Sequence, residues 1–256
     1  MHLSYIIILS IVEGITEFLP ISSTAHLIIT AHFLGLTQSN FMQFFEIFIQ
    51  IGAIFSVFTI YFKELLTNKK LWILLTMSFI PTAILGLIGT KLLRPLVFGN
   101  LFVISMSLII VGILFIIIEN AINKKHIKLN KTIYKMSTSH ALIIGTLQAL
   151  AIIPGVSRSG AVILTMLLLR YKRKDAVKYS FLLGLPTISA AALHDAVKIK
   201  IWTLPYNLLT PTILGTLLSF VFAYIAVKWL INYIKTHDLK IFGWYRILVG
   251  LLIIFT

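Results

Sequence analysis

The chain has 256 residues, of which 59% are hydrophobic and 12% are charged, and its mean hydropathy is +0.99. This composition excludes an ordinary soluble domain and predicts an all-α polytopic membrane protein. The net charge of +14 lies mostly in short loops, so lipid headgroups and membrane topology explain it better than nucleic acid, which we do not expect as a partner. Disulfides and thiolate metal sites are excluded because the chain has no cysteine.

The first notable element, EGITEFLPISSTAHLI at residues 13–28, places polar and charged side chains inside an apolar segment. A helix should break at Leu19 and Pro20, because proline removes a backbone donor, and a second short helix should start at the hydroxyl residues that follow. The chain is therefore predicted to turn back inside the membrane as a re-entrant hairpin, where irregular backbone must be buried or line a wet cavity. The N-terminus lacks the basic region of a signal peptide, so we expect this segment to be retained.

Six later stretches are apolar and long enough to cross a hydrocarbon core of about 30 Å, which takes about 20 helical residues. A second interrupted segment, with its break at Pro154 and Gly155, separates the third stretch from the fourth. The six stretches are residues 41–62, 71–90, 101–120, 179–196, 208–230 and, more marginally, 242–256.

The two interrupted segments belong to an internal repeat. With a shift of 135 residues, VEGITEFLPISST at 12–24 lies over LQALAIIPGVSRS at 147–159, which pairs Ser22 with Ser157. A second match, between PTAILG and PTILG, follows at a shift of 130 residues. Each half then contains one hairpin and three transmembrane helices. Because a hairpin returns to its own side and three crossings follow, the second half starts from the opposite face, and the repeats are predicted to be inverted.

We therefore expect a single membrane domain, 1–256, with repeats at approximately 1–120 and 136–256. The basic residues orient this domain. The loops at 63–70, 120–138, 170–178 and 228–240 carry 16 Lys and Arg residues, whereas those at 91–99 and 196–206 carry only Lys91, Arg94, Lys198 and Lys200. By the positive-inside rule the first group is cytoplasmic, and both termini lie on the outer face.

Glu13 and Glu17 are four residues apart and share one helix face, so their charges repel each other unless something positive lies between them. Carboxylate oxygens suit Mg²⁺ or Ca²⁺, particularly a cation shared with substrate phosphates. The sequence therefore predicts a divalent-cation site. The alternatives are a proton held on one glutamate and an ion pair with an arginine.

PGVSRSG places Arg158 between Ser157 and Ser159 at the start of a helix. The free amides of a helix N-terminus and the planar fork of an arginine both suit an anion such as phosphate. The alternative is that the serines only cap the helix and that Arg158 pairs with Glu13 or Glu17. Even this ion pair would bring the two hairpin tips together.

Ser23 and His26 lie three residues apart, close enough to share a helix face. A nucleophile and a general base can be arranged in this way. A Ser-x-x-His spacing alone more often means a helix cap and a structural histidine. The neighbouring carboxylates and the arginine of the second hairpin favour a functional pair here.

EGITEFLPISSTAH and PGVSRSG resemble the two signature motifs of the bacterial undecaprenyl-diphosphate phosphatases of the bacitracin-resistance type. The resemblance runs the whole chain and includes FFEIFIQIGAI and YSFLLGLP. It implies hydrolysis of undecaprenyl diphosphate to undecaprenyl phosphate and phosphate, which recycles the lipid carrier for peptidoglycan. It also implies a divalent cation and an inverted-repeat fold in the bacterial plasma (inner) membrane, with the site open to the outer face. A homodimer is an open alternative to a monomer.

The resemblance places the acidic motif of the family on Glu13 and Glu17. The family threonine two residues after Gly160 is Val162 in this chain, so we carry no role over to it. The expected catalytic residues are Glu17, Ser23, His26 and Arg158; the diphosphate-binding residues are Ser22, Ser157, Arg158 and Ser159; and the metal ligands are Glu13 and Glu17.

Two questions stay open at this point. Ser23 could attack phosphorus directly with His26 as its base, or it could orient a metal-bound water. A polyprenyl-phosphate transporter or flippase is the alternative to a phosphatase, because inverted repeats with broken helices also build secondary transporters. A transporter needs binding groups but no nucleophile, acid or base, so the combination of Ser23, His26, the paired glutamates and Arg158 favours the phosphatase.

Overall fold

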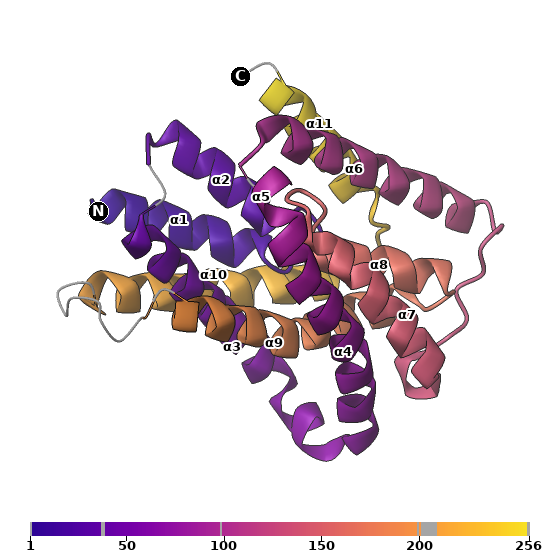
Figure 1. Cartoon of the computed structure of the whole chain (residues 1–256). Coiled ribbons are helices and arrows are strands. Elements are labelled where there is room, and N and C mark those ends of the chain that lie inside the picture. The colour runs from indigo at the N-terminus through magenta and orange to yellow at the C-terminus, as the bar shows by residue number, and fades with distance from the viewer. Residues whose placement is uncertain (1, 37–38, 98, 199, 201–208, 255–256) are drawn as a thin grey trace.

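The computed structural model describes residues 2–36, 39–97, 99–198, 200 and 209–254, and this part of the chain is helical, with one isolated β-bridge between Lys131 and Tyr171 (Figure 1). The predicted all-α fold is confirmed. The helices are α1 (Leu3–Thr16), α2 (Ser23–Phe33), α3 (Asn40–Thr67), α4 (Lys69–Leu92), α5 (Arg94–Val97), α6 (Leu101–Asn123), η1 (Ile133–Lys135), α7 (Thr138–Gln148), η2 (Ala149–Ile152), α8 (Arg158–Leu168), α9 (Arg173–Lys198), α10 (Leu209–Tyr233) and α11 (Lys240–Ile254).

Five of these helices, α3, α4, α6, α9 and α10, are long and apolar enough to cross a membrane. The first four predicted spans lie within α3, α4, α6 and α9. The fifth lies within α10 except for residue 208, which is outside the described residues. The marginal sixth span corresponds to α11, which has 15 residues. Residues 255 and 256 of that span also lie outside the described part. The chain is thus a polytopic helical membrane protein.

Both predicted helix breaks occur, and the two breaks have the same local geometry. The turn after α1 contains Pro20 and ends at Ser22, whereas the turn after η2 contains Pro154 and ends at Ser157. Ser22 has φ 75° and Ser157 has φ 74°, a region that residues other than glycine seldom adopt. Each serine is the N-cap of the next helix, and its hydroxyl accepts the backbone N–H three residues later.

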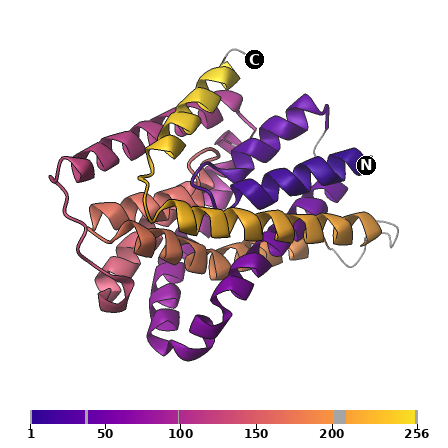
Figure 2. The same ribbon diagram turned by 180° about the vertical axis from the view of Figure 1, so that it is seen from behind.

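Close helix contacts rely on glycine and serine, as expected where lipid leaves packing and hydrogen bonds to drive association. A Cβ atom added at Gly14 of α1 would lie 2.6 Å from the carbonyl oxygen of Ser219 in α10. Gly112 of α6 and Gly243 of α11 face each other, and a Cβ on either would lie 2.7 Å from the carbonyl oxygen of the other. In the view from behind, α6 and α11 form one layer beside the other long helices (Figure 2).

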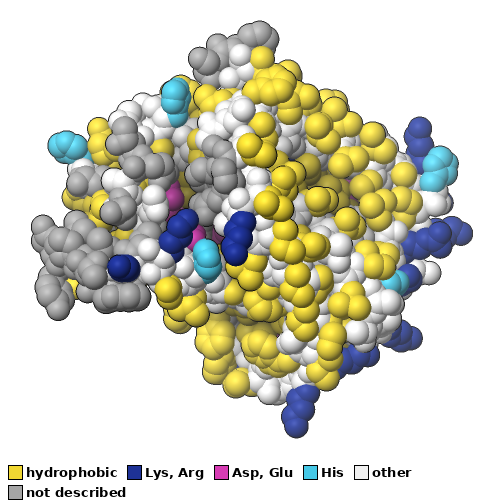
Figure 3. Space-filling model, viewed as in Figure 1, with side chains coloured by type: hydrophobic (Ala, Val, Ile, Leu, Met, Phe, Trp, Pro, Cys, Tyr) yellow, Lys and Arg dark blue, Asp and Glu magenta, His cyan; other side chains and the backbone are white. Residues whose placement is uncertain are grey.

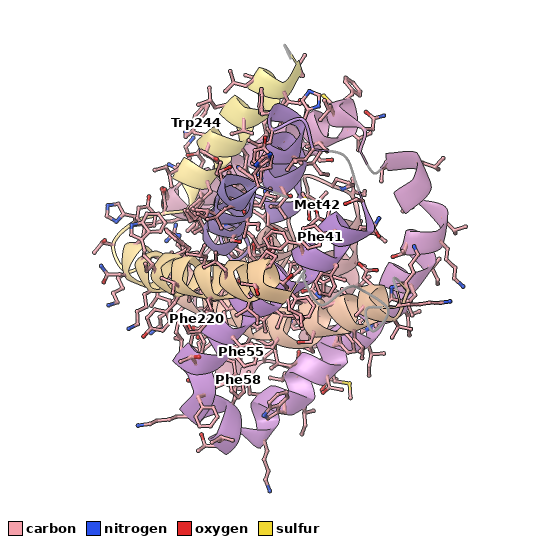
Figure 4. All side chains as sticks on the ribbon, turned by 90° about the vertical axis from the view of Figure 1, so that its left-hand side faces the viewer. Phe41, Met42, Phe55, Phe58, Phe220 and Trp244 are labelled. Carbon is pink, nitrogen blue, oxygen red and sulfur yellow. The ribbon has the colours of Figure 1, made fainter. Side chains whose placement is uncertain are left out.

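The outer surface is largely apolar, as required for contact with lipid. Phe55 and Phe58 project from α3 and are 55% and 40% exposed, and Phe220 projects from the adjacent α10 (Figure 4). The interior holds Phe18, Phe115 and other apolar side chains from both halves of the chain. This core surrounds the two turns and brings them together near the centre of the molecule (Figure 1).

Candidate active site

The turns that precede α2 and α8 contact each other directly. The Nη2 group of Arg158 donates to Oε1 of Glu17 at 3.1 Å, which forms an ion pair. The hydroxyl of Ser159 donates to the carbonyl oxygen of Leu19 at 3.0 Å. Residues 140 or more positions apart in the sequence are therefore neighbours. The ion pair that sequence alone left as an alternative for Arg158 is present, with Glu17 as its partner.

Glu17 also accepts a hydrogen bond from Ser23, which follows the same turn. The hydroxyl of Ser23 donates to Oε2 of Glu17 at 2.5 Å, so one oxygen of the carboxylate binds Ser23 and the other binds Arg158. In the overlay of the two repeats, Ser23 and Arg158 occupy equivalent positions. Because α1 ends at Thr16, Glu17 lies where the carboxylate can reach both short helices.

Arg158 is held in place by groups other than Glu17. Its Nη1 donates to the carbonyl oxygen of Ser180 at 2.6 Å, and the guanidinium lies 5.5 Å from the ring centroid of Phe18. A Cβ atom added at Gly184 would lie 2.7 Å from Nη1, so the glycine of α9 leaves the space that the guanidinium occupies. The planar fork is therefore oriented before any ligand binds.

Glu13 is completely buried, and neither of its carboxylate oxygens has a hydrogen-bond partner among the described residues. The charges of Glu17 and Glu46 repel Glu13, whereas the charge of Arg158 attracts it. A buried carboxylate without a partner is costly, and hard oxygen ligands suit a divalent cation. Glu13 and Glu17 thus fit the expected metal. In the described part of the chain, no three His, Cys, Asp or Glu side chains converge on one metal position, so ligands other than these side chains would complete the coordination.

The ring nitrogens of His26 hydrogen-bond to groups other than Ser23. Its Nδ1 lies 2.7 Å from the carbonyl oxygen of Ser22, and its Nε2 lies 2.8 Å from the hydroxyl of Tyr245. Since a carbonyl oxygen can only accept, Nδ1 carries the proton, and in the neutral ring Nε2 accepts from Tyr245. The two rings are also stacked, with an interplanar angle of 7°. The hydroxyl of Ser23 hydrogen-bonds to Glu17 and not to His26, and the role of His26 in the reaction stays a prediction.

A cavity of about 790 Å³ lies next to these groups. Of the predicted site residues, Glu17, Ser22, Ser23, Ser157 and Arg158 line it. Figure 3 shows acidic, basic and histidine side chains gathered around a hollow on the face viewed there. Polar side chains that the sequence did not single out also line the cavity, and these include Thr24, Gln50, Thr82, Thr90, Gln148 and Thr187.

Four residues of interest do not line this cavity. Glu13 and Ser159 are buried and are not part of the cavity lining, and His26 lies on the side of α2 that faces Tyr245. Val162 is fully buried within the main apolar core. The apolar wall of the cavity comes from α4, η2 and α9.

Sequence reasoning missed Arg246 of α11, which is completely buried. Its Nη1 donates to the carbonyl oxygen of Pro20 at 2.9 Å, and its Nη2 donates to those of Gly155 at 2.5 Å and Val156 at 3.1 Å. One guanidinium thus binds both turns. A signal was available, because a lone arginine in the apolar run IFGWYRILVGLLII is unusual for an intramembrane helix.

Comparisons with known proteins agree over almost the whole chain. The model of the family described as bacitracin resistance protein BacA matches residues 6–252. A protein of Aquifex aeolicus named undecaprenyl-diphosphatase is 43% identical over 247 residues, which cover 96% of this chain and 94% of that protein. One of Wolinella succinogenes with the same name is 40% identical over 255 residues, covering 100% of this chain and 98% of its own. A third, from a Sulfurihydrogenibium species, is 41% identical over 249 residues and covers 96% of each chain.

Proposed function

This chain belongs to the BacA family of bacitracin resistance proteins, and on that premise we propose that it is a membrane phosphatase. It hydrolyses undecaprenyl diphosphate to undecaprenyl phosphate and inorganic phosphate, and so recycles the lipid carrier for peptidoglycan synthesis. The observation that carries this proposal is the convergence of Ser23 and Arg158 on Glu17 at the edge of a cavity. A hydroxyl, a carboxylate and a guanidinium are the groups that phosphoryl transfer needs for attack, proton transfer and charge stabilisation.

Arg158 and the N-termini of α2 and α8 bind the diphosphate. Both helices start beside the cavity, at Ser22 and Ser157, and their free amides and dipoles attract phosphate oxygens. Ser159 links the two turns through the carbonyl oxygen of Leu19, next to the same amides. As negative charge builds on the transferred phosphoryl group, the fixed fork of Arg158 stabilises it.

Glu17 is the group placed to take the proton of Ser23. If the Ser23 oxygen attacks, its bond to the terminal phosphorus forms while the bond from phosphorus to the bridging oxygen breaks, and the serine proton passes to Glu17. Water then releases the phosphate from the serine. If water attacks instead, Ser23 orients it, and Glu17 again accepts the proton. His26, which binds the carbonyl oxygen of Ser22, positions the start of α2 in either case.

Glu13 and Glu17 are the residues that would hold a divalent cation, Mg²⁺ or Ca²⁺. When bound, the cation neutralises charge on the diphosphate. The orphaned oxygens of Glu13 support this assignment, because they gain a partner only when a cation or a proton arrives.

We further propose that α1–α2 and α7–α8 are re-entrant hairpins of two inverted repeats. In the repeat overlay, α1 corresponds to α7, α3 to α9 and α4 to α10. Equivalent helices make equivalent contacts, because α1 packs on α10 as α7 packs on α4, and α3 packs on α10 as α9 packs on α4. This agreement supports the repeat. The cavity lies between the last turns of α4 and α9, next to the loops with few basic residues. A site that opens to the outer face of a bacterial inner membrane, with both termini on that face, follows from the positive-inside rule.

The deciding experiment is phosphate release from undecaprenyl diphosphate by the purified full chain in detergent, with and without a chelator. We expect release that the chelator abolishes and that added Mg²⁺ or Ca²⁺ restores. Arg158→Ala should reduce turnover per folded molecule by at least about 100-fold, with the folded fraction of the variant quantified because the substitution also removes the ion pair with Glu17. Absence of release from folded parent protein would overturn the phosphatase and favour lipid transport through the same cavity.

A further inference from the structure

Arg246 joins the two turns of the site through a single side chain. It donates to Pro20, which lies midway between Glu17 and Ser23, and to Gly155 and Val156, which immediately precede the start of α8. Its side chain is completely buried. The three acceptors are carbonyl oxygens in stretches where the helices are interrupted, so helical amides do not satisfy them.

No carboxylate accounts for the position of Arg246. The ion pairs formed by the described residues do not include it, and its Nε has no hydrogen-bond partner among those residues. A buried guanidinium is expensive in a membrane protein, and the carbonyl oxygens of the two turns supply the compensation in this structure. The free-energy cost of burying Arg246 is therefore offset by hydrogen bonds that hold the two turns at a fixed separation.

The helix that carries Arg246 is firmly anchored. The glycine pair Gly112 and Gly243 brings α11 against α6, and the hydroxyl of Ser105 in α6 donates to the carbonyl oxygen of Gly250 at 2.5 Å. The neighbouring residue, Tyr245, binds His26 of α2. From this rigid helix, one side chain fixes the turn that carries Glu17 and Ser23 relative to the turn that carries Arg158.

We propose that Arg246 is a positioning residue for the hydrolysis, a role that rests on the proposed function. It sets the relative placement of the two turns, so that Ser23, Glu17 and Arg158 face one cavity in the geometry that the reaction requires. Arg246 does not line the cavity and does not touch substrate. Its planar fork reaches carbonyl oxygens on both sides at once, whereas a lysine ammonium is a compact point charge and cannot span them in the same way.

The test compares Arg246→Lys and Arg246→Met with the parent chain in steady-state phosphate release from undecaprenyl diphosphate, with folded protein quantified for each. We expect kcat per folded molecule to fall by about 100-fold for Arg246→Met and by at least about tenfold for Arg246→Lys, because a misplacement of about 1 Å has effects of this size. The KM should rise by less than kcat falls, because the groups that bind the diphosphate are all retained and only their relative placement changes.

Arg173→Lys is the matched control. Arg173 also uses its fork in a buried contact, with both oxygens of Glu119, but it lies at the start of α9, away from the cavity. This control should lower the unfolding temperature and leave kcat per folded molecule unchanged. If Arg246 had only a structural role, its variants would likewise unfold at a lower temperature and keep the kcat per folded molecule of the parent.

A second measurement reports the position of the turns directly. The chain has no cysteine, so spin labels can be attached to Ile15→Cys in α1 and Leu150→Cys in η2, two exposed positions that are equivalent in the repeat overlay. We expect a narrow distance distribution in the parent and a broader or shifted one after Arg246→Lys.

Unchanged kcat in both folded Arg246 variants, or failure of both variants to fold, would overturn the positioning role, the latter in favour of a purely structural one. An unchanged distance distribution in folded Arg246→Lys would overturn it as well. If the parent itself releases no phosphate, the proposed function fails, whereas the distance measurement still decides whether Arg246 holds the turns together.

Discussion

The carboxylate of Glu17 accepts hydrogen bonds from the hydroxyl of Ser23, at the start of α2, and from the guanidinium of Arg158, at the start of α8. This arrangement explains why a polar cluster is retained inside an apolar chain, since each group compensates the burial of the others. It also changes the chemistry that the sequence suggested for Ser23. The spacing of Ser23 and His26 favoured histidine as the base, yet both ring nitrogens of His26 bind elsewhere.

Ser23→Ala tests the role of the hydroxyl. We expect kcat to fall by well over tenfold, because the hydroxyl that donates to Glu17 is placed to attack, and proton transfer from a positioned group commonly contributes about 10²–10⁴-fold. The measurement is steady-state phosphate release. Ser56→Ala is the control, because Ser56 is a buried serine that donates to a carbonyl oxygen within α3 and does not line the cavity, whereas Ser23 is half-buried beside it. A loss below about tenfold for Ser23→Ala would instead support attack by water.

Gly184→Ala tests whether the orientation of Arg158 matters. The added methyl group would lie 2.7 Å from Nη1 and must displace the guanidinium. We expect a loss of kcat of at least about tenfold, since oriented charge stabilisation is sensitive to small displacements. Gly215→Ala is the control, because its methyl group would also collide with a side chain, 2.7 Å from Cζ of Phe45, between α10 and α3 and away from the cavity. Equal losses of kcat in both variants would show that the effect is general packing damage.

At the scale of elements, serine caps and proline-containing turns create the two broken helices, and glycines let the helices approach closely. The caps and the turns were predictable, because proline and hydroxyl residues act on their own stretch of backbone. The contacts between helices were not, because they depend on which faces meet. The buried pair of Glu119 in α6 and Arg173 in α9 is an example, since neither residue stands out in the sequence.

Glu119→Gln should destabilise the protein. Both oxygens of Glu119 accept from Arg173, and Oε1 also accepts the backbone N–H of Leu239 before α11, so one carboxylate ties three elements together. Breaking a buried pair typically costs about 3–5 kcal/mol, because it leaves a charge without its partner. Thermal or denaturant unfolding in detergent measures the loss. In the double variant with Arg173→Met, part of the stability should return; a double variant less stable than Glu119→Gln would contradict this account.

For the whole molecule, the proposed orientation in the membrane is inferred from the apolar outer surface and the uneven distribution of basic residues. Figure 3 shows a broad apolar surface, with Lys and Arg side chains concentrated along its lower right edge. The cavity is lined at its mouth by His194, Asp195 and Lys198, at the end of α9. A charged edge on one side and the cavity mouth on the other fit a protein that meets its substrate from one face.

Accessible cysteines test this orientation. The parent chain has none, so Leu96→Cys in α5 and Lys128→Cys after α6, both at exposed positions, can be labelled individually with a membrane-impermeant maleimide. We expect Leu96→Cys to react in intact cells and Lys128→Cys to react only after permeabilisation, by the positive-inside rule. The parent chain serves as the unlabelled control. The reverse pattern would invert the proposed topology and place the cavity mouth on the cytoplasmic side.

The sequence by itself determined the helical membrane class, the positions of both breaks, and the acidic and arginine-containing motifs, because hydropathy, helix breaking and capping act within short stretches of chain. Only the tertiary structure decided that Ser23 binds Glu17 instead of His26, that α4, η2 and α9 form the apolar wall, and that Arg246 joins the two turns. Arg246 lies 226 residues from Pro20 and 91 from Gly155. Contacts over such separations depend on how the helices pack, and no local pattern encodes which carbonyl oxygen a buried side chain will reach.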